Sequence, residues 1–125
     1  MRIDLPILEQ KLENDSIVNS ERTASFTLDT SVYSEERWEK NFPELARHEG
    51  LFQYIERIDK DSISDRVKVA CMLKAIYCFM ESDEIPTYKS FAQLINLAVP
   101  EYTTRLIDTL KNAFRLILNG SSVKN

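Results

Sequence analysis

Two cysteines and one histidine are the side chains of this 125-residue sequence with the widest chemical range. Cys71 and Cys78 are seven residues apart, which on a helix places them on one face, roughly 10 Å apart and too far for a disulfide. Both lie in the most apolar run of the chain, where cysteine acts as a small buried hydrophobe. His48 is distant in sequence, and a metal site needs more ligands at closer spacing. The sequence therefore predicts no metal and no cofactor, and free buried thiols fit a reducing compartment such as the cytoplasm.

Acidic residues occur in pairs, but each pair falls at a helix start or in a connector. Glu35 with Glu36, and Asp83 with Glu84, occupy such positions. Acids there stabilise helix N-termini or lie in solvent, whereas acid–base catalysis needs carboxylates that a scaffold holds together. No Gly-x-Ser-x-Gly turn presents a nucleophile. We therefore expect a protein that is not an enzyme.

The overall charge also limits the partners. The net charge is −4, from 20 acidic and 16 basic residues, and binding to a nucleic-acid backbone needs a surplus of Lys and Arg. The apolar run 69–80 is too short to span a bilayer, which takes about 20 residues, and the N-terminus does not resemble a signal peptide. We expect no nucleic-acid partner, no membrane association and a location in the cytoplasm.

The elements that must position these side chains are predicted to be mostly helical. The segment Val69–Met80 carries only one charge, Lys74, so it is predicted to belong to a central helix over 64–80 with neighbours on most sides. Capped apolar faces predict the other helices at 35–42, 44–58, 87–98 and 100–118. The fold class is thus mostly α: a single-domain bundle of four to five helices over 21–120, with one short N-terminal strand and a flexible tail at 121–125.

The inner faces of these helices predict the core. Seven side chains recur at helical spacing and are expected to be buried: Leu73, Ile76, Phe91, Leu94, Leu106, Leu110 and Phe114. Lys74 is expected to reach solvent along its aliphatic stem.

The N-terminal segment allows several interpretations. Residues 1–20 are predicted to be either a short amphipathic helix starting near Pro6 or an arm that docks on a partner. Arg22–Leu28 alternates between apolar and polar residues, which predicts a strand. Because a lone strand needs a partner, this strand would pair with the N-terminus or with another subunit, or it would simply be extended.

Aromatic residues gather just after this predicted strand. Trp38 and Phe42 are four residues apart, on one face of a short charged helix that follows Tyr33. They are predicted either to pack on the central helix or to form an exposed anchor for another protein, since aromatic anchors dominate interface energetics. The candidate protein-binding residues are Tyr33, Trp38 and Phe42, with Phe26 and Leu28 of the strand.

The order of these segments has a parallel in a known family. An extended segment Thr23–Asp29, a turn into a Trp-containing helix at Thr30–Pro43, and Leu51–Ile58 precede three further helices and a short polar tail. This layout resembles tail assembly chaperones of long-tailed bacteriophages of Gram-positive hosts. The resemblance implies a non-catalytic protein that binds the tape measure protein, helps to recruit tail tube protein, and is absent from the mature virion.

Other assignments remain open beside this resemblance. One is a different helical phage adaptor, such as a head–tail connector component. Another is a small regulatory module that binds protein or nucleic acid. Self-association is compatible with each of them.

Overall fold

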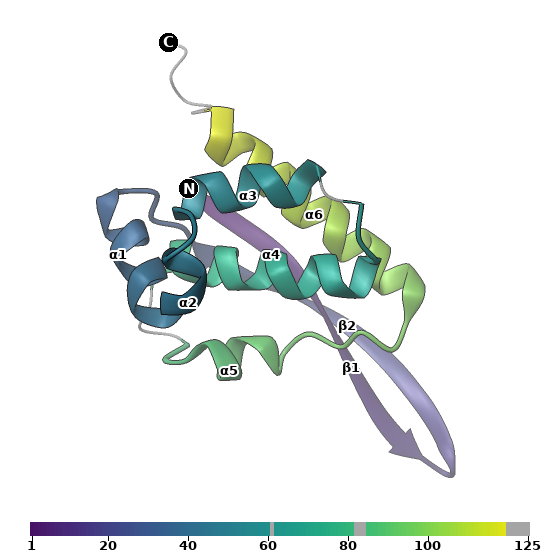
Figure 1. Cartoon of the computed structure of the whole chain (residues 1–125). Helices are drawn as coiled ribbons and strands as arrows, with labels where there is room; N and C mark the ends of the chain where they lie inside the picture. Colours follow the sequence, from purple (N-terminus) through teal and green to yellow (C-terminus); the bar gives the residue numbers. More distant parts are fainter. Residues whose placement is uncertain (61, 82–84, 120–125) are drawn as a thin grey trace.

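The chain folds into a long β-hairpin followed by a group of helices (Figure 1). The computed structural model describes residues 1–60, 62–81 and 85–119, so the tail predicted at 121–125 lies outside the described residues. The elements are β1 (Arg2–Glu13), β2 (Ser16–Thr27), α1 (Val32–Asn41), α2 (Pro43–Ala46), α3 (Leu51–Lys60), α4 (Asp65–Phe79), α5 (Tyr88–Ala92) and α6 (Pro100–Asn119). This is an α+β arrangement, and the predicted mostly α bundle of four to five helices is wrong.

The N-terminal segment differs most from the prediction. Strand β2 pairs antiparallel with β1 along its whole length, from Arg2 opposite Thr27 to Glu13 opposite Ser16. The short helix expected within residues 1–20 is therefore wrong, and the strand predicted at 22–28 is longer and fully paired with the N-terminus. Asn14 and Asp15 form the two-residue turn with φ angles of 49° and 65°, a left-handed conformation that Asn and Asp tolerate.

Pro6 lies inside β1, where its missing N–H would ordinarily cost a hydrogen bond between strands. A two-residue turn makes Glu13–Ser16 a hydrogen-bonded pair, and such pairs then alternate along the ladder. Pro6 and Thr23 fall on a pair that is not hydrogen-bonded, so the nitrogen of Pro6 faces away from β2. The Pro6 carbonyl faces the same way and accepts a hydrogen bond of 2.6 Å from the Tyr102 hydroxyl of α6.

The two main helices follow the sequence pattern closely. Helix α4 begins after Ser64, whose hydroxyl accepts a hydrogen bond from the Val67 amide, and α6 begins at Pro100 as predicted. Helix α1 begins at Val32, earlier than the predicted residue 35, because Ser31 is its N-cap. The Ser34 side chain is buried and donates to the Ser31 carbonyl.

Two predicted helices are shorter in the structure. The helix predicted at 44–58 is divided into α2 and α3, with Gly50 directly before α3. The helix predicted at 87–98 ends at Ala92. Beyond it, the Asn96 side chain accepts a hydrogen bond from the Ala98 amide and donates one to Gln10 of β1, and these bonds favour a loop over a continued helix.

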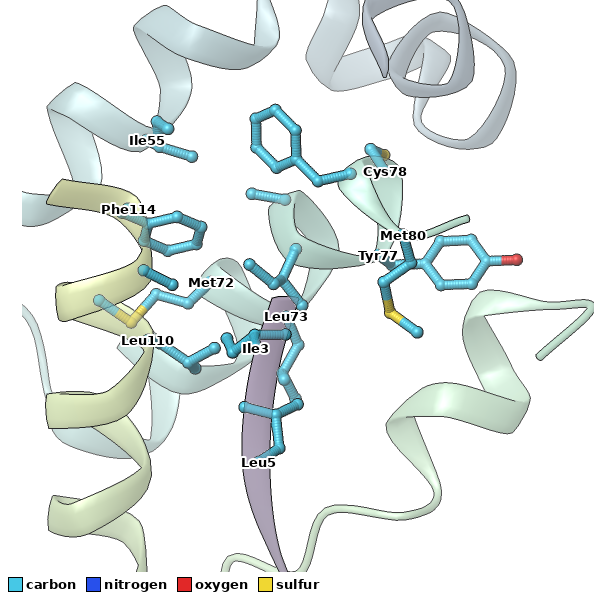
Figure 2. Close-up of a cluster of buried hydrophobic side chains, with 14 of the residues drawn as sticks. Ile3, Leu5, Ile55, Met72, Leu73, Tyr77, Cys78, Met80, Leu110 and Phe114 are labelled. Carbon is cyan, nitrogen blue, oxygen red and sulfur yellow. The ribbon is translucent and has the colours of Figure 1, made fainter. Parts of the chain in front are cut away.

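The core lies between α4, the other helices and the base of the hairpin. Helix α4 contacts α1, α3, α5 and α6, which confirms it as the central helix. Of the seven predicted core residues, six are buried and Leu94 is half-buried, as is Lys74. Figure 2 shows Ile3 and Leu5 of β1 among Leu73 and Leu110, so the hairpin base is part of the same core.

No helix in the described ranges combines the length and the apolar character needed to cross a bilayer.

Candidate protein-binding surface

Trp38, the central residue of the predicted aromatic anchor, is completely buried. Its indole ring lies 4.6 Å from the Tyr54 ring and 5.6 Å from the Phe42 ring, measured between centroids. Its N–H donates to the Glu49 carbonyl at 3.0 Å, so the polar end of the side chain is also satisfied inside the fold. Trp38 is thus placed in the core rather than on an exposed anchor, because α3 folds back over α1.

The strand residues of the candidate set are also interior. Phe26 packs edge-to-face on Phe91 at 5.9 Å, and Leu28 is buried where it forms an isolated bridge with Met80. Phe42 is half-buried and contacts the Tyr88 ring at 5.1 Å. The structure therefore brings most of the candidate residues to the core, and not to one surface.

Tyr33 is the exposed member of the set, with 56% of its surface accessible. The guanidinium of Arg37 lies 4.9 Å from its ring centroid, a cation–π contact. Arg37 itself is buried, and its Nε donates to the Cys78 carbonyl at 2.6 Å. A surface cleft of about 470 Å³ lies here, lined by Tyr33, Glu36, Arg37, Glu39 and Lys40. The mixed charge of this lining selects no ligand class.

Asp29 is the acidic partner of Arg37, with Oδ2 3.5 Å from the guanidinium. Hydrogen bonds from the side chain and backbone of Ser31 hold the pKa of the Asp29 carboxyl below its usual value, and Arg37 lowers it further. The pair joins the end of β2 to α1, while the Arg37 bond to Cys78 joins α1 to the last turn of α4. The contacts of Arg37 therefore hold α1 against the end of β2 and the last turn of α4.

The two thiols differ in accessibility. Cys78 is fully buried, and burial raises the pKa of its thiol to about 12, whereas Cys71 is half-buried. Within the described residues, no group of three or more His, Cys, Asp or Glu side chains is placed to hold a metal ion.

This difference predicts how the thiols react. In a Cys71→Ser variant at pH 8, alkylation of Cys78 by iodoacetamide is expected to be slower in the native protein than in urea by roughly a thousandfold, because little thiolate forms in the core. Mass spectrometry of timed samples measures both rates. Native and unfolded rates within tenfold of each other would contradict the burial of Cys78.

Three exposed apolar side chains lie at the far end of the hairpin. Leu12, Ile17 and Val18 are 74%, 68% and 42% exposed. Leu12 and Ile17 are direct cross-strand neighbours. Figure 1 shows that this end of the hairpin extends beyond the helices, and we call these three residues the apolar tip.

The hairpin is held firmly up to the start of this tip. Gln10 and Asn19 are hydrogen-bonded across the strands at 2.9 Å, and Asn96 donates to Gln10 at 3.0 Å. Closer to the body, Arg105 of α6 forms an ion pair with Glu21 through both of its terminal nitrogens. The apolar tip is therefore carried at the end of an arm that is tied to the helices.

Sequence reasoning did not find the apolar tip. The available signal was Asn14-Asp15 between two runs of strand-forming residues, which predicts a hairpin turn. The predictions for residues 1–20, a short amphipathic helix or a docking arm, did not use this signal.

In comparisons with known proteins, no family model, no curated protein and no solved structure matched this chain.

Proposed function

We propose that this protein is a non-catalytic binding factor that holds another polypeptide at the far end of its hairpin. The observation that carries the proposal is the apolar tip, in which Leu12 and Ile17 are exposed side by side on one face of the hairpin and Val18 is exposed on the other face. Grouped exposed apolar surface on a small protein is typical of an interaction site. A cross-strand pair such as Leu12–Ile17 would gain from being covered, because apolar area removed from water stabilises a complex by about 25 cal/mol per Å².

The way the arm is held favours binding. The base of the hairpin is in the core, through Ile3 and Leu5, and its middle is tied by the Arg105–Glu21 pair. A surface that is already ordered loses little conformational entropy when a partner binds, so more of the contact energy appears as affinity.

The partner we propose is the tape measure protein of a long-tailed bacteriophage. This part of the proposal is supported by the resemblance in layout to tail assembly chaperones. A long, mostly helical chain exposes apolar stripes before assembly, and these would need temporary cover during tail morphogenesis. On this proposal the protein acts in the host cytoplasm, helps to bring tail tube protein to the complex, and is absent from the finished virion.

The test is co-expression with the tape measure protein that, on this proposal, is encoded by a neighbouring gene. The wild-type protein is expected to keep the tape measure protein soluble and to copurify with it. A triple variant, Leu12→Thr, Ile17→Thr and Val18→Thr, keeps strand-forming residues in the hairpin but removes most of its apolar surface. Affinity for a tape measure fragment, measured by calorimetry, is expected to fall by about thirtyfold, the usual loss for an interface hot spot.

A matched control uses exposed apolar residues elsewhere. Val67 in α4 and Leu116 in α6 are 51% and 49% exposed, far from the hairpin in sequence. A Val67→Gln, Leu116→Gln variant is expected to bind like the wild type. Equal loss of binding in both variants, or a wild-type protein that leaves the tape measure protein insoluble and unbound, would overturn the proposal.

A further inference from the structure

The two outer edges of the hairpin are protected to different degrees. On β1, Pro6 presents no N–H, and its carbonyl is occupied by Tyr102 of α6. Helix α6 also packs on β1. A proline and a covering helix are two of the usual devices that stop an edge strand from pairing with another chain.

The outer edge of β2 lacks both devices. By the same alternation that directs Pro6 outward, every second residue of β2 has its N–H and C=O directed away from β1: Ile17, Asn19, Glu21, Thr23 and Ser25. At the base this edge is in use, because the Thr27 carbonyl accepts a hydrogen bond of 3.0 Å from the Glu81 amide. From Ser25 outward to Ile17, no such bond reaches the edge from any described residue.

We propose that a second copy of this chain pairs with this edge. Strand β2 would lie antiparallel to β2 of the second copy, about a twofold axis at Ser20, so that two hairpins form one four-stranded sheet. The inference goes beyond the proposed function and does not depend on it, since it rests on the edge and not on the apolar tip.

The alternation restricts where the twofold axis can lie. Outward-directed residues must face outward-directed residues, so the axis passes through a residue and not between two. An axis at Glu21 or at Arg22 places like charges directly opposite each other, which is destabilising. An axis at Thr23 places Asn19 opposite Thr27 of the second copy, where Glu81 already occupies the edge.

An axis at Ser20 avoids both problems. It pairs the strands from Ser16 to Ala24, which keeps clear of the position that Glu81 occupies near Thr27. An axis closer to the turn, at Asn19 or Val18, would shorten the paired segment and lose hydrogen bonds. Of the registers without opposed like charges or overlap with Glu81, the one at Ser20 is therefore the longest.

The side chains brought together by this register are compatible. Ile17 lies opposite Thr23 of the second copy, a pair of β-branched residues suited to adjacent strands. Asn19 lies opposite Glu21, whose carboxylate is paired with Arg105 and keeps lone pairs that can accept from the Asn19 amide. Ile17 and Val18, which are exposed in the single chain, would each gain a neighbour from the second copy. The Leu12 side chain belongs to β1 and remains outside the new strand pair.

The first test is the molar mass in solution, by analytical ultracentrifugation over a range of concentrations. The wild type is expected to sediment as a dimer of twice the 14.5 kDa chain. Asn19→Pro removes an N–H that faces away from β1, so it leaves the backbone hydrogen bonds between β1 and β2 intact, as Pro6 does. The dissociation constant of the dimer is expected to rise by about tenfold or more, because a hydrogen bond between the two copies is lost.

Gln10→Pro is the matched control. Gln10 is the cross-strand partner of Asn19, so both variants lose the hydrogen bond between these two side chains, but Gln10 faces the outer edge of β1. Gln10→Pro also loses the hydrogen bond from Asn96. This variant is expected to dimerise like the wild type. A wild-type protein that stays monomeric, or a dimer that Asn19→Pro and Gln10→Pro weaken equally, would overturn the inference.

The register is tested by cross-linking, which does not depend on how the proline variants fold. Ser20→Cys places two thiols at the axis, on a pair that is not hydrogen-bonded, where Cα atoms lie about 4.5 Å apart and a disulfide can form. Mild oxidation is expected to give a covalent dimer with Ser20→Cys and none with Thr23→Cys, whose counterpart is Ile17. Cross-linking of Thr23→Cys in place of Ser20→Cys would refute this register. Neither assay contains the tape measure protein, so failure here is distinct from failure of the proposed function.

Discussion

Replacing Trp38 with alanine is expected to lower the free energy of unfolding by about 3–5 kcal/mol, the usual range for removing a large buried aromatic. The ring is 0% exposed and packs on Tyr54 and Phe42, so its removal leaves a cavity lined by other rings. It also leaves the Glu49 carbonyl without its donor. Urea denaturation followed by circular dichroism measures the change.

Tyr33→Ala is the control for this prediction. Tyr33 lies in the same helix but is 56% exposed, so its replacement is expected to change the free energy of unfolding by no more than about 0.5 kcal/mol. A loss of less than about 1 kcal/mol for Trp38→Ala would mean that the indole is not packed as described. If the expected loss is found, a Trp38→Ala, Phe42→Ala variant is unsuitable for testing binding, because loss of structure would be mistaken for loss of contact.

Replacing Leu5 with alanine is expected to lower the free energy of unfolding by about 2–5 kcal/mol. Leu5 is 0% exposed, and Figure 2 shows it in β1 beneath Ile3 and close to Leu73. Because β1 carries the base of the hairpin into the core, the cavity would also weaken the attachment of the arm. Faster amide hydrogen exchange across β1 and β2, beside a lower urea midpoint, is the expected result.

Leu12→Ala provides a control in the same strand with the same change of side chain. Leu12 is 74% exposed, so its replacement is expected to alter the free energy of unfolding by no more than about 0.5 kcal/mol. Equal effects of the two substitutions would show that the hairpin base is not anchored in the core. Unequal effects, as expected here, allow the far end of the arm to be altered for binding studies without loss of the fold.

Both proposals involve the same part of the hairpin. Ile17 and Val18 belong to the apolar tip and also to the β2 edge that a second copy would cover. A partner that covers the apolar tip would therefore compete with the twofold sheet for these two side chains. The proline pair Asn19→Pro and Gln10→Pro separates the effects, because neither substitution removes an apolar side chain.

The sequence by itself determined the helical core. Helices α4 and α6 were predicted to within about two residues, because α4 contains a nearly uncharged apolar run and α6 carries an apolar face at 3.6-residue spacing, with a capping residue or proline at the start of each. Six of the seven predicted core residues are buried for the same reason. Such patterns act within one helix, so they can be recognised without knowing the neighbours.

The tertiary structure alone decided the N-terminal hairpin and the environment of Trp38. Pro6 argues against a strand until the turn at Asn14 and Asp15 sets the alternation of the ladder and shows that its nitrogen faces outward. Trp38 lies on a charged helix, and its burial depends on α3 folding back to supply Tyr54. These outcomes depend on contacts between residues far apart in the sequence, which local periodicity does not encode.

The same reason explains why some apolar residues of the hairpin are buried and others are exposed. Ile3, Leu5 and Ile7 are buried, whereas Leu12 and Ile17 are exposed, although all are branched aliphatic residues in strands. Residue type determined that these segments favour strands. Distance from the helices determined which of them are covered, because α4 and α6 reach the base of the hairpin and end before its tip, and that distance exists only in the folded chain.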